Sequence, residues 1–344
     1  MTRAMPAFDL DTYVERSKAV DLSTIDWAAV PRYPVSPETI RTLRYMQDIE
    51  SHTIIYLRSL LATRAIDDPE VATFLACWLY EETFHGVALA RFLDAAGAPV
   101  GPRPTPRGQE PLGKRVEAAA TALVSKTWPD FCAVHMTWGA INELTTLTGY
   151  RRLAAVSPHP VLDELLDRIV RDESRHFFFY YRQAEIRMQR RSAARVARLL
   201  VDRFWVPVGS GVQPDTELRF LATYLFGGPE GRAAARKVDD TIRRLPGFET
   251  VELLEAWMNR HVDDREPVPE GGRHQPPCRG PAPCSAQRPI PPTPDCTGDG
   301  RSRRPRPTRH SRAPRSKPRC ADWRARAWCA RTWSRHVVGR LRGR

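Results

Sequence analysis

Two short segments of this 344-residue chain carry the same pair of residues, a glutamate followed three positions later by a histidine. The first pair is Glu82-x-x-His85, and the second, ninety-one residues later, is Glu173-x-x-His176. On a helix, positions i and i+3 face the same side, so the carboxylate and the imidazole of each pair can reach one metal ion. About 0.5 such pairs are expected by chance in this composition, so the argument rests on the pair recurring within apolar helical patterns.

Each pair is preceded by a helical stretch that offers one inward-facing glutamate. Glu50 lies 32 residues before Glu82, and Glu143 lies 30 residues before Glu173. One glutamate from each of two helices, with Glu-x-x-His from each of the other two, is the ligand set of di-metal carboxylate bundles. Four carboxylates in an apolar interior would repel or take up protons unless cations neutralised them. The sequence therefore predicts two metal ions bound by Glu50, Glu82, His85, Glu143, Glu173 and His176.

The donor atoms also indicate which metal is expected. Oxygen-rich ligation with one imidazole per metal suits iron or manganese, whereas structural zinc favours thiolates in closed tetrahedra. Iron is the commoner choice, so we expect two iron ions, with manganese as the alternative.

Helix start signals place these residues on four long helices. Ser36-Pro37 and Asp68-Pro69 each combine an N-cap residue with proline at the first helical position, and predict helices over residues 37–65 and 69–97. Two further helices are predicted over residues 128–157 and from Pro160 onward. The proline-rich stretch 97–111 provides the long crossover that joins the two helical pairs of such a bundle.

The rest of the chain divides near residues 35 and 265. Residues 1–35 are predicted to be an amphipathic but irregular lead-in, and residues 36–265 one helical domain. No stretch alternates long enough to predict a sheet, so the expected fold is all-α, a four-helix bundle with additional C-terminal helices. Shorter helical patterns cover residues 112–126, 193–205, 217–226, 231–244 and 251–261.

The formal charge of +13 belongs to the C-terminal tail. Residues 1–265 hold 34 Lys+Arg against 35 Asp+Glu, whereas residues 266–344 hold 19 against 5. The tail also has 14 of the 31 prolines and few large apolar residues, so we expect it to be disordered and, without a folded motif, not to bind nucleic acid. Its composition resembles GC-rich DNA translated out of frame, a hypothesis that an intact reading frame on resequencing would contradict.

The sequence predicts a cytoplasmic protein. Charged residues, among them Arg3, Asp9, Asp11, Glu15, Arg16 and Lys18, interrupt the first thirty positions, which therefore lack the apolar run of a signal peptide. No 18-residue apolar stretch is present, so no membrane span is expected. Only two cysteines, Cys77 and Cys132, precede residue 265, and they are typical of a reduced protein rather than a disulfide scaffold.

The two motifs resemble those of the soluble acyl-acyl-carrier-protein desaturases, within the ferritin-like di-iron superfamily. Residues 81–86, Glu-Glu-Thr-Phe-His-Gly, are similar to the first family motif, and residues 172–176, Asp-Glu-Ser-Arg-His, to the second. The resemblance covers about residues 36–207 and implies a ferritin-like four-helix bundle. Phe84 departs from the family, which usually has a basic residue at this position.

The resemblance also implies a role for each site residue. Glu82 and Glu173 would bridge the irons, Glu50 and Glu143 would each bind one iron terminally, and His85 and His176 would bind one iron apiece. Asp172 would hydrogen-bond a ligand imidazole on its far side, the usual partner of a metal-bound histidine. Thr146 follows Glu143 by three residues, where the family has a threonine beside the oxygen site; an ordinary helix-face threonine explains it equally well.

The implied activity is O2-dependent desaturation of a fatty acyl chain carried on acyl carrier protein, by a homodimer. The chain has no Gly-rich dinucleotide fingerprint and no iron-sulfur cysteine set, so its electrons must come from a partner such as ferredoxin. An acidic carrier protein needs a basic surface. Six arginines after the fourth long helix either provide one or form an ordinary solvated face: Arg182, Arg187, Arg190, Arg191, Arg195 and Arg198.

Three alternatives remain open at this point. A di-iron oxygenase could hydroxylate or N-oxygenate another organic substrate. A ferritin-like iron- or peroxide-handling protein is the second, although it needs only a bare bundle and leaves the helices after residue 190 unexplained. The third is a metal-free helical interaction protein with a basic tail.

Overall fold

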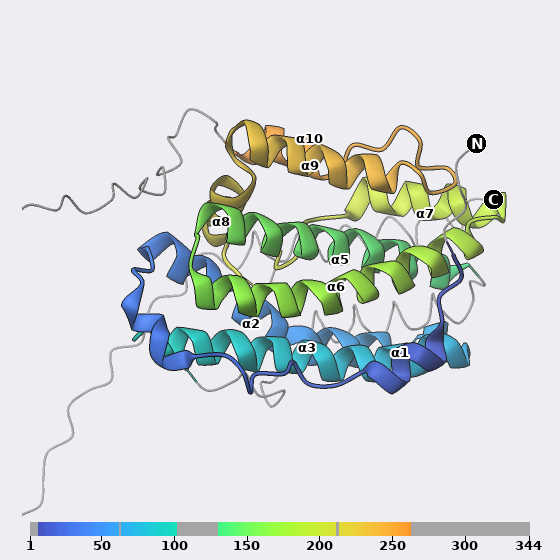
Figure 1. Cartoon of the computed structure of the whole chain (residues 1–344). Coiled ribbons are helices and arrows are strands. Elements are labelled where there is room, and N and C mark those ends of the chain that lie inside the picture. The colour runs from blue at the N-terminus through green and yellow to red at the C-terminus, as the bar shows by residue number, and fades with distance from the viewer. Residues whose placement is uncertain (1–5, 62, 102–129, 211–212, 263–344) are drawn as a thin grey trace, which may run out of the picture.

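The computed structural model describes residues 6–61, 63–101, 130–210 and 213–262, and this part of the chain is helical without any strand (Figure 1). The all-α prediction is confirmed for these residues. The predicted helix at 112–126, most of the crossover and the predicted tail lie outside the described residues. Among the described helices, none is long and apolar enough to cross a membrane.

Four long helices lie side by side and carry the predicted ligands (Figure 1). Helix α2 packs on α3 and α5 on α6, while contacts between α3 and α6 join the two pairs. Helix α2 ends earlier than predicted, at Leu60, and a 3-10 helix, η2 (Arg64–Asp67), follows it. The helices span α2 (Pro37–Leu60), α3 (Pro69–Ala95), α5 (Phe131–Val156) and α6 (Pro160–Arg187).

Capping residues fix where three of these helices begin. Ser36 Oγ accepts from the backbone nitrogen of Thr39 at 3.1 Å, as its N-cap pattern predicts. Asp68 Oδ1 accepts from the backbone nitrogen of Glu70 at 3.0 Å. The third cap is His159, whose Nδ1 accepts from the backbone nitrogen of Leu162; the sequence did not predict this cap. These caps set the helix starts and hence the direction in which each ligand points.

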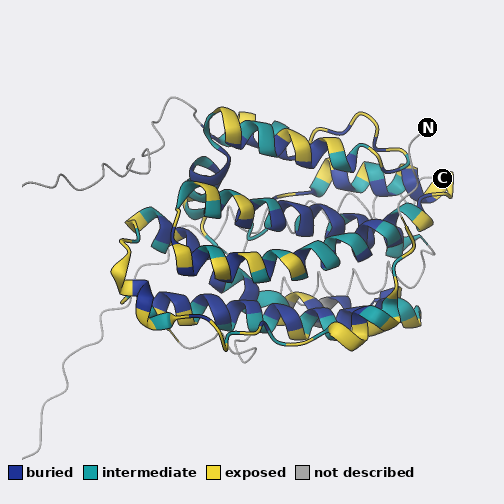
Figure 2. Ribbon diagram, viewed as in Figure 1, coloured by how far each residue is buried: buried dark blue, intermediate teal, exposed yellow. Residues whose placement is uncertain are grey.

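A further layer of helices covers α5 on the side away from α6 (Figure 1). Helix α5 is apolar on nearly all sides because it packs against α6 on one face and α7, α8 and α9 on others. Figure 2 shows exposed residues gathered on the outer faces of the helices. These helices lie within a few residues of their predicted positions: α7 (Arg191–Phe204), α8 (Asp215–Phe226), α9 (Gly228–Ile242) and α10 (Leu254–His261).

The described part of the lead-in, residues 6–35, is more ordered than predicted. It contains α1 (Leu10–Arg16) and a 3-10 helix, η1 (Trp27–Arg32), and both contact α3. Tyr13 on α1 is only 2% exposed, and the ring of Phe8 lies 5.0 Å from that of Phe179 in an edge-on contact. The prediction of an irregular segment is wrong here because burial of these aromatic rings stabilises a helix too short to show a periodic pattern.

Candidate metal centre

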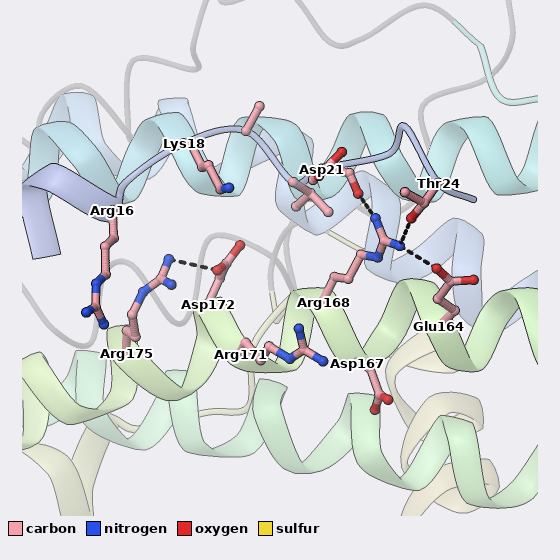
Figure 3. Close-up of a pocket in the computed structure, with 12 residues that line it drawn as sticks. Arg16, Lys18, Asp21, Thr24, Glu164, Asp167, Arg168, Arg171, Asp172 and Arg175 are labelled. Atoms are coloured by element: carbon pink, nitrogen blue, oxygen red, sulfur yellow. Dashed lines mark hydrogen bonds and ion pairs between the residues drawn. The ribbon is translucent and has the colours of Figure 1, made fainter.

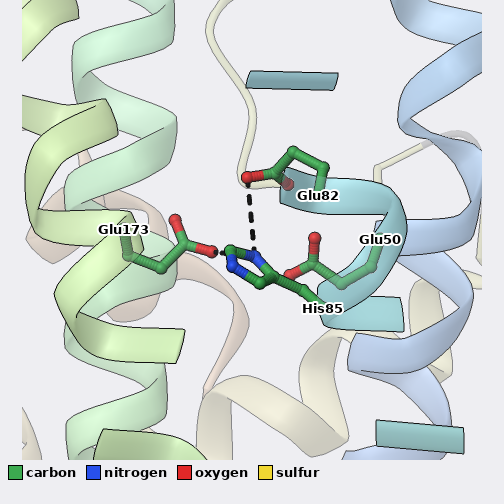
Figure 4. A group of neighbouring side chains, drawn as sticks. All are labelled: Glu50, Glu82, His85 and Glu173. Carbon is green, nitrogen blue, oxygen red and sulfur yellow. Dashed lines mark ion pairs between the residues drawn. The ribbon is translucent and has the colours of Figure 1, made fainter. Parts of the chain in front are cut away.

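The six predicted ligands come together in one buried cluster. Helix α2 supplies Glu50, α5 supplies Glu143, and α3 and α6 each supply one Glu-x-x-His pair. Each of these residues is 7% exposed or less. The cluster consists of two groups, each able to hold a metal ion, whose potential ligand atoms lie within 4.8 Å of one another. They are Glu50, Glu82, His85 and Glu173 (Figure 4), and Glu82, Glu143, Glu173 and His176.

Both imidazoles turn the same nitrogen toward the carboxylates. His85 Nδ1 lies 3.2 Å from Glu173 Oε1 and 3.7 Å from Glu82 Oε1. His176 Nδ1 lies 2.9 Å from Glu82 Oε1 and 3.7 Å from Glu143 Oε2. Each histidine therefore presents Nδ1 as the atom that could bind a metal, and Glu82 and Glu173 stand between the two.

The other nitrogen of each imidazole faces a carboxylate from the opposite helix. His85 Nε2 lies 3.2 Å from Asp172 Oδ2 on α6, and His176 Nε2 lies 2.7 Å from Glu81 Oε2 on α3. Arg175 Nη2 donates to both carboxylates, at 2.7 Å to Asp172 and 2.8 Å to Glu81. Such contacts fix the tautomer and the orientation of an imidazole that binds a metal. The structure thus places Asp172 where the motif resemblance puts it.

Glu81 is a partner of His176 that the sequence did not lead us to predict. A signal was available, because in both motifs an acidic residue stands directly before the central glutamate: Glu81 before Glu82, and Asp172 before Glu173. The two motifs therefore make equivalent contacts: the acidic residue of each motif contacts the histidine of the other.

This arrangement predicts that the two metal positions can be weakened separately. Asp172→Asn is expected to weaken binding at the His85 position, and Glu81→Gln at the His176 position, each by about 10- to 100-fold. Competition with a chromophoric chelator, titrated with ferrous iron, measures both binding steps. The matched control is Asp167→Asn, because Asp167 is exposed on the same helix as Asp172. Equal weakening of both steps by either variant would contradict the pairing.

Two buried tyrosines extend the hydrogen-bond network, and neither was predicted. Tyr13 donates to Glu81 Oε2 at 2.8 Å, and Tyr150 donates to Glu50 Oε1 at 2.5 Å. Burial raises the pKa of Tyr150 well above its ordinary value, and the neighbouring Glu50 adds to the effect. The phenol therefore stays protonated and serves as a donor that holds Glu50 in place.

Removing the Tyr13 hydroxyl is expected to affect both stability and metal binding. Tyr13→Phe leaves a buried carboxylate, Glu81, with one donor fewer, at a cost of about 1–3 kcal/mol in the free energy of unfolding. Iron affinity at the His176 position should fall about tenfold, because Glu81 orients that imidazole. Urea unfolding and iron titration measure the two effects. Tyr33→Phe, at a 42% exposed tyrosine, should change neither quantity.

Helices α2 and α3 approach each other closely beside Glu50, at a glycine of the first motif. A Cβ atom added at Gly86 would lie 3.1 Å from Ser51 Oγ and 3.3 Å from the Cβ of Glu50. A larger residue at this position would therefore press on Ser51 and Glu50, and glycine avoids that contact.

Electrostatics set the protonation state of the cluster when no metal is bound. Burial raises the pKa of Glu50 well above its ordinary value and that of Glu143 to about 8. Burial and the neighbouring Glu173 raise the pKa of Glu82 as well. Burial alone would also raise the pKa of Glu173, but His176 and His85 outweigh it and lower this pKa to about 2.

The two histidines have the opposite balance of forces. Burial would lower the pKa of His85, but the nearby carboxylates of Asp172 and Glu173 raise it well above its ordinary value. Burial acts on His176 in the same way and is likewise outweighed by the carboxylates around it, Glu143, Glu173 and Glu81. Without metal, both imidazoles and the carboxyl groups of Glu50, Glu82 and Glu143 therefore hold their protons to higher pH than free side chains do, whereas Glu173 loses its proton at lower pH.

The donor atoms that face the middle of the cluster fit two divalent cations. Five of them are buried and lack any hydrogen-bond partner among the described residues: Glu82 Oε1, His85 Nδ1, Glu173 Oε1 and Oε2, and His176 Nδ1. Each buried polar atom left without a partner costs about 1–3 kcal/mol. Two divalent cations would bind these atoms and also balance the four carboxylates, leaving both imidazoles neutral.

The two remaining predictions concern Thr146 and the basic patch. Thr146 is half-buried on α5, one turn after Glu143, and its hydroxyl makes no hydrogen bond with a described residue. Four of the six arginines are paired: Arg182 with Glu185, Arg187 with Asp68, Arg190 with Asp130 and Arg198 with Asp202. Arg191 and Arg195 alone among the six lack an ion pair within the described part of the chain, so the patch is weaker than charge counting suggests.

The site thus unites four carboxylates and two imidazoles from four helices, in two groups with two members in common. Comparison of the chain with protein-family models, with curated proteins and with solved structures finds no match.

Proposed function

We propose that this chain is an O2-dependent di-iron oxidoreductase with a ferritin-like bundle, and that it desaturates a fatty acyl chain carried on acyl carrier protein. The observation that carries the proposal is the pair of metal-binding groups that share Glu82 and Glu173. Two ions that share ligands lie close enough to act together on one reacting group. A single structural ion would need only one of the two groups.

The donor set supports iron. Each group offers three carboxylates and one imidazole and no thiolate, a combination typical of iron or manganese. When bound, such a pair of ions supplies the O2 and redox chemistry that removes hydrogen from an unactivated C–H bond. The chain's own residues keep the site dry and oriented: burial excludes water, Tyr150 holds Glu50, and Asp172 and Glu81 fix the two imidazoles.

Desaturation, rather than another O2-dependent reaction, is supported by the resemblance of both motifs to the acyl-acyl-carrier-protein desaturases. Thr146 shares a helix face with Glu143 and Tyr150, and its half-buried hydroxyl is free to hydrogen-bond an oxygen species or water there. Ferredoxin is the proposed electron donor, and the unpaired Arg191 and Arg195 are proposed contacts for the acidic carrier protein.

The test is product analysis with acylated carrier protein, ferredoxin, its reductase and O2. Mass spectrometry should find a product with two hydrogens fewer than the substrate, and Glu173→Ala should abolish it. Glu185→Ala, on the same helix but outside the cluster, should retain it. A product that gains oxygen would instead identify an oxygenase, and iron oxidation without any organic product would identify an iron- or peroxide-handling protein.

A further inference from the structure

A pocket of about 450 Å³ lies between the segment that follows α1 and the outer face of α6 (Figure 3). Arg168 on α6 anchors one wall of this pocket. It donates to the backbone oxygen of Asp21 and, at 2.5 Å, to Thr24 Oγ1, and it also pairs with Glu164. These contacts hold residues 21–24 against α6, so the wall is preformed.

Several charged groups of the lining already have partners. Arg175 donates to Asp172 and, beyond the pocket, to Glu81. The carboxylate of Asp21 accepts from the backbone nitrogen of Ser23 at 3.0 Å and from its hydroxyl at 2.6 Å. Together with the Arg168 contacts, these bonds account for two of the five cations that line the pocket.

Three cations of the lining remain without a partner. Arg16, Lys18 and Arg171 are exposed and make no hydrogen bond or ion pair with any residue that the structure describes. Figure 3 shows Arg16 and Lys18 extending from the N-terminal segment toward α6, which carries Arg171. The lining holds four carboxylates, Asp21, Glu164, Asp167 and Asp172, against the five cations, so the pocket has an excess of one positive charge.

Three cations without an ion pair on one concave surface repel each other and create a local positive potential that attracts an anion. Two guanidinium forks and one ammonium match the oxygens of a phosphoryl group in both charge and hydrogen-bond geometry. The volume is large enough for an organic molecule as well as its phosphate. We propose that this pocket binds the phosphoryl group of an organic phosphate between Arg16, Lys18 and Arg171.

The pocket adjoins the network around the candidate metal centre. Asp172 and Arg175 line it, and the same two residues contact His85 and Glu81. A ligand bound here would lie against the groups that orient the imidazoles. The phosphoryl group has two sources, a free organic phosphate or the prosthetic arm of a carrier protein; only the second depends on the proposed function.

Calorimetric titration of the full chain with inorganic phosphate and with 4′-phosphopantetheine tests the site. Both probes should bind saturably, and the double variant Arg16→Gln/Arg171→Gln should weaken binding by about tenfold or more. Both residues are exposed and unpaired, so this variant should fold normally. The matched control is Arg191→Gln/Arg195→Gln, which removes the same charge from the unpaired arginines of α7 and leaves the basic C-terminal segment unchanged.

The possible results of this titration distinguish the phosphate site from the proposed reaction. Absence of saturable binding, or equal weakening in both double variants, would overturn the site. Tighter binding of phosphopantetheine than of inorganic phosphate would support the carrier arm as the source. Equal binding would show that the pantetheine chain makes no contacts, which would exclude the carrier arm and leave a different organic phosphate. The two proposals can fail separately, because this experiment measures heat of binding and not activity. If desaturation is absent but phosphate binding still depends on Arg16 and Arg171, the proposed reaction is rejected and the phosphate site is retained.

Discussion

Glu173→Ala is expected to remove both iron ions, whereas His85→Ala and His176→Ala should each remove one. Glu173 belongs to both metal-binding groups, as does Glu82, while each histidine belongs to one group only. Loss of a shared ligand leaves each position two carboxylates and one imidazole and also removes the residue that links the positions. Elemental analysis after anaerobic loading with ferrous iron and desalting measures the iron content, which should be about two per chain in the unaltered protein.

Glu185→Ala provides the control, because Glu185 lies on the same helix and pairs with Arg182 outside the cluster. It should retain the full iron content. Far-ultraviolet circular dichroism of each variant checks that the bundle is folded. Unchanged iron content in Glu173→Ala would refute the shared-ligand arrangement, and an unaltered chain that binds no iron would refute the proposed function as a whole.

The sequence was sufficient to predict which six residues cluster because their signals are local. Glu82 and His85 lie on one helical face through their spacing alone, and the caps at Ser36 and Asp68 announce where two of the helices begin. The pairing of two helical hairpins follows from repetition of the motif. Each of these inferences uses residues a few positions apart, for which the geometry of a helix leaves little choice.

Contacts between distant residues could not be predicted in the same way. Tyr13 reaches Glu81 across 68 positions, from a seven-residue helix with no usable periodicity. The arginine patch shows the same contrast: the partners of Arg182 and Arg198 lie three and four residues away and could have been anticipated, whereas those of Arg187 and Arg190 are brought in by the fold. Charge counting overestimates a basic surface when tertiary partners are unknown.

The metal-free protein is expected to lose stability as pH rises from about 5 to about 8. The pKa of Glu143 is about 8 in the folded protein against an ordinary value of 4.5, so the folded state binds more protons than the unfolded state between these values. The free energy of unfolding then falls with rising pH, by roughly a few kcal/mol for this residue. The raised pKa values of His85 and His176 add to this loss of stability. Their contribution to the free energy of unfolding is present in full below pH 6.5 and disappears as pH rises past their pKa in the folded protein.

The pKa shift of Glu173 has the opposite sign, so this residue limits the stability of the protein in acid. Its pKa of about 2 means that its contribution is present above 4.5 and is lost as pH falls toward 2. The two trends together place the stability maximum of the metal-free protein near pH 5. Urea unfolding in the presence of a chelator, at about pH 5 and about pH 8, measures the difference. Glu143→Gln should flatten the alkaline fall, because an amide in that position has no proton to lose, and Glu185→Gln should not.

Iron should reverse this pH dependence, since metal and protons compete for the same atoms. Binding of two ions requires neutral imidazoles and ionised carboxylates, so it releases the protons held by Glu50, Glu82, Glu143 and both histidines. Affinity therefore rises with pH, and metal-loaded protein should be more stable at pH 8 than metal-free protein by RT ln(1 + [metal]/Kd). Calorimetry in buffers of different ionisation enthalpy counts the protons released. Two results would contradict this account: a metal-free protein that becomes more stable between about pH 5 and pH 8, and iron binding without proton release. Either would mean that the carboxylates are already ionised and that cations do not replace protons in this cluster.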